Sequence, residues 1–333
     1  EITKIDKIII NQNYSGKYYN LESRTMSMSM TSEHVIPYLS NGKKYKEKTA
    51  SDCYKKLKRI NLFRSFNSNL GKGIGLNELE LKLYILLAAD GSISNKNLGR
   101  LRFKKKRKIN YSLDILDKLG ISYRIYPQKD LSESINFTIP ESIMKFNIKG
   151  LDSKLLECTR EQCQIILDTY INSDGYKNNN SWIIYSSKEE EIDLLQHLFT
   201  INGFLSKKSI RSDHGFSKNN SYELHVNDLK TRHCNISELK EETSTDKLFW
   251  CIKTSNQNFI CRRNGFSYLT GNCHGNIDEY NEKSTDLRVD VGVDGKLADG
   301  KILVPLSKII NYFNQKTDGL KWSAWSQGKC KNL

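Results

Sequence analysis

Apolar residues at helical spacing form two similar stretches in the middle of the chain, Leu83 to Gly91 and Ile165 to Gly175. Each stretch narrows to small residues and closes with an Asp-Gly pair, at positions 90–91 and 174–175. Glycine readily adopts the left-handed conformation that ends many helices, so the pattern predicts two helices that stop at these glycines. Small residues also let two helix backbones approach closely, and we expect the two helices to pack side by side.

The pattern that follows each helix is repeated as well. Asp90 and Asp174 are 84 residues apart (174 − 90), and Gly120 and Gly203 are 83 apart (203 − 120). A fixed period of this kind indicates a duplicated unit. We expect a strand, a helix and two further strands in each half, at Leu101–Phe103, Ser112–Leu119, Tyr123–Tyr126 and Ile135–Ile139, and again at Trp182–Tyr185, Glu189–Phe199, Ser206–Arg211 and Tyr222–Val226.

The two aspartates are unusual residues for the ends of helices. The helix dipole is negative at the C-terminus and disfavours a carboxylate there by roughly 0.3–1 kcal/mol. Two such helices side by side would bring Asp90 and Asp174 together, and a divalent cation would relieve their repulsion. Either motif taken alone is also explained by a core helix that closes in an Asp-Gly turn.

The duplicated unit, from about Leu76 to Asp228, resembles the LAGLIDADG (DOD-type) homing endonucleases with two motifs in one chain. The resemblance implies a pseudo-two-fold αββαββα fold whose antiparallel sheets enter the major groove of double-stranded DNA at a long asymmetric site. It also implies a monomeric nuclease that uses Mg²⁺, with Asp90 and Asp174 as the metal ligands. Lys105 and Lys188, at matching places in the halves, are the candidates for the basic group near each scissile phosphate.

The charge of the chain favours a polyanionic partner. The net charge is +14, and residues 273 to 333 hold nine bases and eight acids, so almost all of the excess lies upstream. A basic run is also typical of a solvated face or of a localisation signal. The candidate DNA-binding residues are Arg100, Arg102, Lys104, Lys105, Lys106, Arg107, Lys207 and Lys208.

The chain on either side of the duplicated unit has a different pattern. Residues 1 to 62 alternate as strands do, at Lys4–Ile10, Tyr18–Glu22 and Thr25–Met30, with a turn expected at 14–17. Residues 63 to 76 are rich in Asn and Gly and predict a linker before the endonuclease-like unit at 77–228, with halves 77–140 and 141–228. Residues 228 to 248 are polar and predict a connector.

Two flanking motifs resemble the splicing blocks of inteins. Thr31-Ser32-Glu33-His34 is similar to an upstream block, and Leu248 to Cys273 is similar to the C-terminal blocks. The resemblance implies an α+β protein in which an all-β Hint splicing domain, 1–62 with 229–272, is interrupted by the endonuclease. The first splicing block is absent, so we expect a chain whose start is missing, by truncation or natural splitting, and whose partner is that missing portion.

The splicing resemblance also assigns chemistry to four residues. Asn272 would cyclise onto its own carbonyl and break the bond to Cys273, whose thiol would first accept the upstream acyl group. Thr31 and His34 would polarise and protonate the upstream scissile bond. The chain departs from the family pattern at Gly271, where His is common, at Cys251, where Asp is common, and at 256–258, where a common His is lacking; these changes put the rate and the acid–base roles in doubt.

Residues 273 to 333 would be the flanking host segment. Cys273-His274-Gly275 and the region around Val304-Pro305 resemble the last part of a calcineurin-like metallophosphoesterase, a short α/β extein in which His274 would be a metal ligand. An isolated Cys-His-Gly is ordinarily a turn. The other ligands are absent, so we expect no phosphoesterase activity from this segment.

The remaining features place the protein inside a cell. No apolar run is long enough for a membrane helix and no signal peptide is visible, so we expect a cytoplasmic protein, in a bacterial or phage-infected cell, with no membrane partner. Six of the cysteines are expected to be buried or reduced thiols: Cys53, Cys158, Cys163, Cys234, Cys261 and Cys330. Two other functions stay open: a maturase-like or degenerate LAGLIDADG module that binds without cutting, and a phosphoesterase fragment with an inert insertion.

Overall fold

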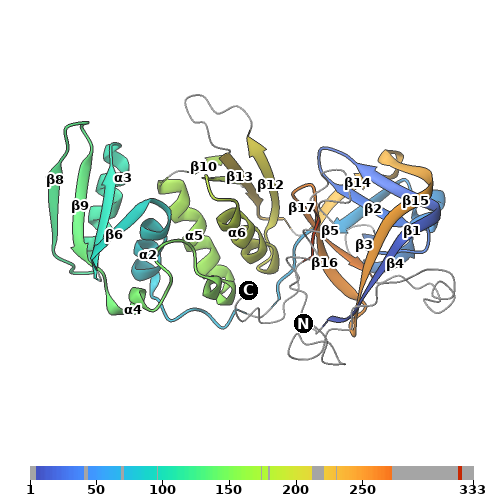
Figure 1. Ribbon diagram of the computed structural model, residues 1–333, viewed down its shortest axis with the longest axis horizontal. Helices are drawn as coiled ribbons and strands as arrows, with labels where there is room; N and C mark the ends of the chain where they lie inside the picture. Colours follow the sequence, from blue (N-terminus) through green and yellow to red (C-terminus); the bar gives the residue numbers. More distant parts are fainter. Residues whose placement is uncertain are drawn as a thin grey trace. The chain divides into compact units, whose positions relative to one another are not determined.

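The chain divides into two compact units, one formed by residues 1–65 and 229–333 and the other by residues 66–228. The computed structural model in Figure 1 describes residues 5–40, 44–68, 71–95, 97–173, 175–178, 181–211, 221–229, 231–271 and 322–324. Both strands and helices are present, so the chain is a mixed α/β protein. In this part of the chain, no helix is long and apolar enough to cross a membrane.

The described residues of the unit 1–65 and 229–333 lie mostly in antiparallel strands. One sheet has the order β15-β1-β2, a second has the order β14-β5-β3-β4, and β17 pairs with β16, which pairs with β18. One short helix, α1 (Ala50–Lys56), follows β4. The strands are β1 (Ile5–Glu22), β2 (Ser27–Thr31), β3 (Val35–Ser40), β4 (Lys44–Thr49), β5 (Arg59–Phe63), β14 (Thr231–Asn235), β15 (Leu239–Thr254), β16 (Asn258–Arg263), β17 (Phe266–Gly271) and β18 (Trp322–Ala324), with the 3₁₀ turn η2 (Ile236–Glu238) before β15.

The turn expected at 14–17 is wrong, because β1 passes straight through it. The pairing of β1 with β15 shifts register between Asn11 and Tyr14 and again between Tyr14 and Gly16, and then continues to Leu21. Gly16 has a φ of +152°, a conformation that L side chains rarely adopt. A polar Tyr-Ser-Gly-Lys sequence therefore makes a bulge in a long strand here, where the partner strand continues on the other side.

The polar connector expected at 228–248 is also wrong. Most of it is strand, with β14 paired to β5 and β15 paired to β1. Its charged side chains are used across the sheet: Glu241 accepts hydrogen bonds from Lys17 at 2.8 Å and from Tyr19 at 2.7 Å. Opposite charges and hydrogen-bonding groups on neighbouring strands stabilise a sheet, and a polar composition therefore does not exclude one.

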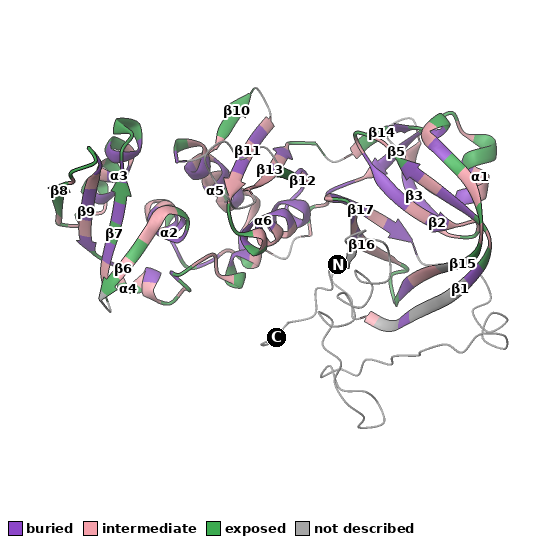
Figure 2. Ribbon diagram, turned by 45° about the horizontal axis from the view of Figure 1, so that its top comes forward, coloured by how far each residue is buried: buried purple, intermediate pink, exposed green. Residues whose placement is uncertain are grey.

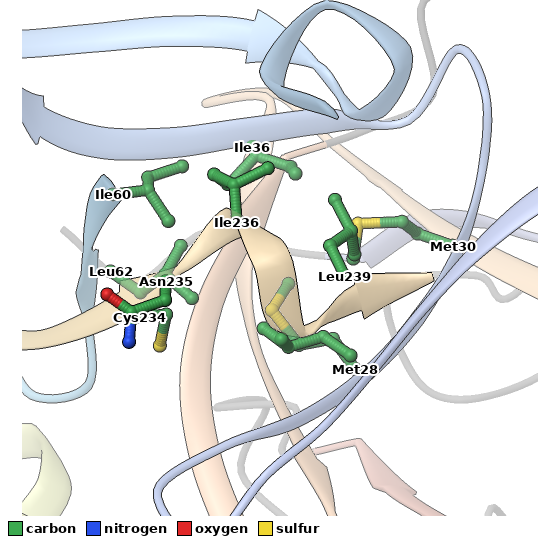
Figure 3. Close-up of a pocket in the computed structure, with 10 residues that line it drawn as sticks. Met28, Met30, Ile36, Ile60, Leu62, Cys234, Asn235, Ile236 and Leu239 are labelled. Atoms are coloured by element: carbon green, nitrogen blue, oxygen red, sulfur yellow. The ribbon is translucent and has the colours of Figure 1, made fainter. Parts of the chain in front are cut away.

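The core of this unit is apolar and rich in methionine. Met26, Met28 and Met30 are buried with aliphatic side chains from β3 and β5, and Met28 and Met30 help to line a small gap whose other walls are chiefly apolar (Figure 3). The buried thiols expected at Cys53, Cys158, Cys163, Cys234 and Cys261 are confirmed, while Cys330 lies outside the described residues. Burial raises the pKa of the Cys53 thiol to about 12, which keeps it protonated near neutral pH.

The second unit contains the repeat. Its first half has helices α2 (Glu78–Asp90), α3 (Lys106–Lys118) and α4 (Glu141–Met144) and a sheet of order β6-β7-β9-β8. Its second half has helices α5 (Arg160–Asn172) and α6 (Glu189–Ile201) and strands in the order β10-β11-β13-β12. The strands are β6 (Gly91–Asn95), β7 (Leu98–Phe103), β8 (Tyr123–Pro127), β9 (Glu133–Thr138), β10 (Tyr176–Asn178), β11 (Ser181–Ser186), β12 (Leu205–Arg211) and β13 (Ser221–Asn227), with the 3₁₀ turn η1 (Ser153–Glu157) before α5.

All eight elements expected after the two motifs are present. The largest difference lies in α3, which begins at Lys106 and not near Ser112. Its first turn is basic, so Lys106 and Arg107, both predicted to contact DNA, belong to a helix. The helical face that carries Lys108, Ile109, Ser112, Ile115 and Leu116 is buried, and this spacing is the signal for the longer helix.

The two motif helices, α2 and α5, pack against each other in the core of this unit (Figure 1). Each begins with a capping box, formed by Asn77 with Glu80 on α2 and by Thr159 with Gln162 on α5. In a capping box the two side chains satisfy backbone N–H groups that the first turn leaves unpaired. The repeat thus extends to the starts of both helices, where the sequence carries the signal in both halves.

The left-handed conformation expected at the end of α2 is wrong. Gly91 has a φ of −93° and a ψ of 170°, and begins strand β6 directly. Glycine is needed there for a different reason: a Cβ at position 91 would lie 2.6 Å from the carbonyl oxygen of Leu87. Gly120 (φ +65°) and Gly203 (φ +84°), which follow α3 and α6, are among the glycines that do have a left-handed conformation.

Candidate nucleic-acid interface and motif-helix ends

Helices α2 and α3 pack against one face of the first sheet, and the side chains of β7 that alternate with the packed ones are exposed. Leu101 and Phe103 of β7 are buried against α2 and α3, whereas the alternate residues Arg100 and Arg102 are exposed (Figure 2). Cross-strand pairing aligns Arg100 with Ser92 of β6 and with Asn136 of β9, and aligns Asn136 with Arg124 of β8. A row of four polar side chains, Ser92, Arg100, Asn136 and Arg124, therefore crosses the open face.

Arg102 lies in the next row and is held in place by its neighbours. Its Nε donates to Ser132 Oγ at 2.9 Å, and its guanidinium lies 3.1 Å from Asp130 Oδ2. Hydrogen bonds from Ser132 and Arg102 lower the pKa of Asp130 to about 2. The carboxylate is therefore ionised at neutral pH and offsets part of the positive charge of this face.

The second sheet presents a less basic open face. Pairing aligns Tyr176 of β10, Ile183 of β11, His225 of β13 and Lys207 of β12 in one row. Glu223, in the adjacent row, lies 3.2 Å from His225 Nε2. The open faces of the two halves thus differ in charge and chemistry although their strands repeat.

The structure places Lys208 away from this face, although sequence analysis included it among the DNA-binding residues. Its side chain is 9% exposed and lies on the side covered by α6, with Nζ 2.7 Å from Glu189 and 2.6 Å from Asp193. Side chains of successive strand residues point to opposite faces, so Lys207 and Lys208 cannot both face the same partner. Lys208 instead ties β12 to α6.

Arg107 connects the two halves. It lies in the first turn of α3, and its guanidinium donates to the carbonyl oxygens of Ile171, Asn172 and Ser173 at 2.8 to 3.1 Å. These carbonyls are at the end of α5, where the helix dipole is negative, and a cation there is stabilising. Arg107 is thus a cap for the second motif helix, while Lys104, Lys105 and Lys106 are exposed.

The C-terminal end of α2, the other motif helix, lies beside Lys108, a second basic residue in the first turn of α3. Asp90 is the last residue of α2, and its Oδ2 lies 3.0 Å from the Nζ of Lys108. The Lys108 side chain is 9% exposed and its Nζ also lies 5.2 Å from the centre of the Phe103 ring. Sequence analysis missed Lys108, although its place on the buried face of α3 could have separated it from the other bases of the run.

Lys105 and Lys188 do occupy matching positions. Each is the residue before a helix, Lys105 before α3 and Lys188 before α6, with extended backbone. Lys105 is exposed, whereas the Nζ of Lys188 lies 2.8 Å from the buried Glu191. The base in contact with Asp90 is Lys108, three residues after Lys105.

A divalent ion would find oxygen ligands of the right kind at the end of α2. Asp90 is partly exposed, at 22% of its side chain, and carboxylate oxygens are the ligands that Mg²⁺ prefers. Asp174 lies outside the described residues. Among the residues that are described, no group of three or more His, Cys, Asp and Glu side chains gathers as a metal site.

A second candidate site lies in the strand-rich unit. Thr31 and His34 form a turn closed by a backbone hydrogen bond from His34 to Thr31 at 3.2 Å, and His34 Nε2 contacts the hydroxyl of Thr270 on β17. A Cβ at Gly271 would lie 2.9 Å from Val35, so β17 lies close against the residue after His34. Asn272, Cys273 and His274 lie outside the described residues.

No family model matches the chain, and no curated protein matches it. Full-length DUF199/WhiA from Thermatoga maritima is similar in structure, with 13% identity and a TM-score of 0.35 over 49% of this chain and 57% of that chain, so the match spans little more than half of it. The N-terminal LAGLIDADG domain of DUF199/WhiA is 16% identical, with a TM-score of 0.32 over 49% and 86%.

A homing endonuclease is also among the similar structures. I-DmoI in complex with DNA and Mn is 12% identical to this chain, with a TM-score of 0.31 over 45% of this chain and 90% of that chain. Other structures of I-DmoI hold its target DNA with Mg, or DNA with Ca. These titles describe I-DmoI and not this chain.

Proposed function

We propose that residues 66–228 bind double-stranded DNA through the open faces of the two sheets. The observation that carries this proposal is the row of Ser92, Arg100, Asn136 and Arg124 across four strands, of which β6 and β7 pack against helices on their opposite face. A β-ribbon fits the major groove, where arginine pairs with guanine and asparagine pairs with adenine. Because one chain supplies both sheets and their open faces differ, it would bind as a monomer to a long asymmetric site.

We further propose that the ends of the motif helices cut the bound DNA with the help of Mg²⁺. Asp90 and Asp174 would hold the ion, which when bound would polarise the phosphate and offset the charge of the leaving oxygen. The role of the protein is to hold Asp90 at the end of a buried helix and close to a basic residue, Lys108. Lys105 and Lys188 remain the candidates that contact the DNA phosphates beside the scissile bonds.

Replacement of the carboxylates tests this function. Asp90→Asn and Asp174→Asn, each in the full chain, should abolish cleavage of the target duplex in Mg²⁺ and leave binding of the duplex nearly unchanged. Cleavage by either variant at the wild-type rate would refute the ligand assignment. If the wild type binds duplex DNA with Mg²⁺ present and leaves it intact, the chain is a binding module, as in a maturase-like or degenerate protein.

We propose protein splicing as a second function, carried by the contact between His34 and Thr270. This contact joins the upstream motif to the strand that leads to Asn272, which would cyclise and release the segment that begins at Cys273. Mass spectrometry of the full chain after incubation at neutral pH, with and without thiol, tests it. A fragment that begins at Cys273 is expected, and an intact chain under both conditions would contradict the proposal.

A further inference from the structure

The ion pair at the end of α2 is part of the packed interior and not a surface contact. Lys108 Nζ lies 3.0 Å from Asp90 Oδ2, with 9% and 22% of the two side chains exposed. The hydroxyl of Ser112 donates a hydrogen bond to the backbone carbonyl oxygen of Lys108 at 2.9 Å. The aromatic ring of Phe103 lies below the ammonium group at 5.2 Å. The ammonium is therefore held beside Asp90 by the fold itself.

The second half carries the opposite charge at the same position. Lys108 is the third residue after Lys105, which precedes α3, and Glu191 is the third residue after Lys188, which precedes α6. Glu191 is also buried, with 7% of its side chain exposed, and accepts hydrogen bonds from Lys188 and Ser186 at 2.8 and 3.0 Å. Both halves therefore have a buried charged side chain at this position, and it is a cation in the first half and a carboxylate in the second.

A carboxylate at a helix C-terminus needs a counter-charge, because the helix dipole is negative there. An ammonium group and a divalent ion can both supply that charge to Asp90. A divalent ion binds carboxylate oxygens at about 2.1 Å for Mg²⁺, with little tolerance for a nearby cation. The two cations therefore compete for one carboxylate.

We propose that Lys108 is a resident counter-cation of Asp90, which a divalent ion has to displace in order to bind there. The proposal rests on the proposed function, in which Asp90 is a metal ligand, and adds a regulation of that site. Lys108 would hold the carboxylate in place before DNA and metal arrive, and would weaken the affinity of this end for the metal. Lys108 is thus a positioning residue that acts through Asp90.

Metal binding measured directly tests the competition. Free Mn²⁺ is titrated into the full chain without DNA and counted by electron paramagnetic resonance. Lys108→Met keeps the length of the side chain without its charge and should bind Mn²⁺ at least tenfold more tightly than the wild type. Lys108→Arg keeps the cation and should bind it like the wild type. Lys118→Met is the matched control, because Lys118 lies on the same helix and pairs with Asp114 at 2.7 Å on the surface.

The outcomes separate this inference from the function on which it rests. Equal Mn²⁺ affinity in Lys108→Met and the wild type, with loss of the same site in Asp90→Asn, would overturn the competition and leave Asp90 as a ligand. Unchanged Mn²⁺ binding in Asp90→Asn would overturn both. Lys108→Met should also melt at a lower temperature than the wild type in EDTA and recover on addition of Mn²⁺. A melting temperature that Mn²⁺ does not raise would contradict the proposed exchange of cations.

Discussion

Lys207 and Lys208 are neighbours in β12, yet only Lys207 lies on the open face of its sheet, in register with His225. Lys208 is 9% exposed and contacts Glu189 and Asp193. The pair separates the two roles that a basic residue can have in this unit, contact with DNA and support of the fold. Two single substitutions distinguish these roles.

Lys207→Ala should weaken duplex binding, with a loss of up to about 0.9 in the slope of log affinity against log salt, the amount expected for one phosphate contact. Its free energy of unfolding should stay close to that of the wild type. Lys208→Met leaves two carboxylates without their shared ammonium and should lower the free energy of unfolding by about 2 kcal/mol. Anisotropy titrations with labelled DNA and urea denaturation measure the two effects. The reverse pattern would contradict the placement of the two side chains.

Asp130 offsets the charge of Arg102 on the open face, so its removal should strengthen DNA binding. Asp130→Asn is expected to raise the affinity for duplex DNA roughly threefold at low salt, an effect that screening reduces at high salt. Asp130→Glu, which keeps the charge, is the control. Weaker binding by Asp130→Asn would mean that Asp130 acts by orienting Arg102 and not by repelling phosphate.

Asp130 also makes the stability of the protein depend on pH. The pKa of Asp130 is lowered in the folded state to about 2. The stability that it contributes is therefore present above its unfolded pKa of about 3.9 and is lost as the pH falls toward 2. DNA affinity between pH 5 and 8 should not respond to Asp130, and a titration of the wild type and Asp130→Asn over this range should give parallel curves.

Gly91 should not tolerate a side chain. A Cβ there would lie 2.6 Å from the Leu87 carbonyl oxygen, so Gly91→Ala must shift the end of α2 and should cost about 1–3 kcal/mol of unfolding free energy. Gly75, before the same helix, has nothing within 4 Å of the corresponding position. Gly75→Ala should be neutral or slightly stabilising. Urea denaturation of both variants measures the difference, and equal stability would contradict the close contact at Leu87.

The contact between His34 and Thr270 should affect the break after Asn272 if the splicing proposal holds. Thr270→Val removes the hydroxyl that contacts His34 and keeps the shape of the side chain, so release of the fragment that begins at Cys273 should slow at least tenfold. Thr270→Ser keeps the hydroxyl and should retain most of the rate. Mass spectrometry over time measures both rates. Equal rates in the wild type and Thr270→Val would show that the contact plays no part.

The repeat was accessible from sequence because apolar spacing, glycines and strand alternation all recur with one period. The predictions that were wrong, the turn at 14–17 and the connector at 228–248, rested on local composition. Tyr14–Lys17 has turn residues, yet its partner strand β15 continues past it and makes it a bulge. Residues 240–247, within the segment predicted to be a connector, are polar, yet their side chains pair across strands. In both cases the strand partner lies more than 200 residues away, and local composition carries no information about it.

The site was predictable to the same extent. Arg100 and Arg102 follow from the sequence around β7 and Asp90 follows from the motif, whereas Arg124 of β8 was not predicted. Lys108 and Arg107 belong to a run of five basic residues, and charge alone does not tell which members of the run contact the ends of the motif helices. Their partners are fixed by the packing of α3 against α2 and α5, which requires the tertiary structure.

The salt dependence of duplex binding tests the central claim most directly. The full chain and the double variant Arg100→Ala/Arg124→Ala are titrated with labelled duplex DNA from 50 to 200 mM salt, with Lys44→Ala/Lys46→Ala, two exposed lysines of β4, as a variant of equal net charge. We expect tight binding by the wild type and by the β4 variant, and weaker binding with a shallower salt slope when the two arginines are removed. Equal weakening in the two variants would contradict the assignment of the open sheet face as the DNA-binding surface.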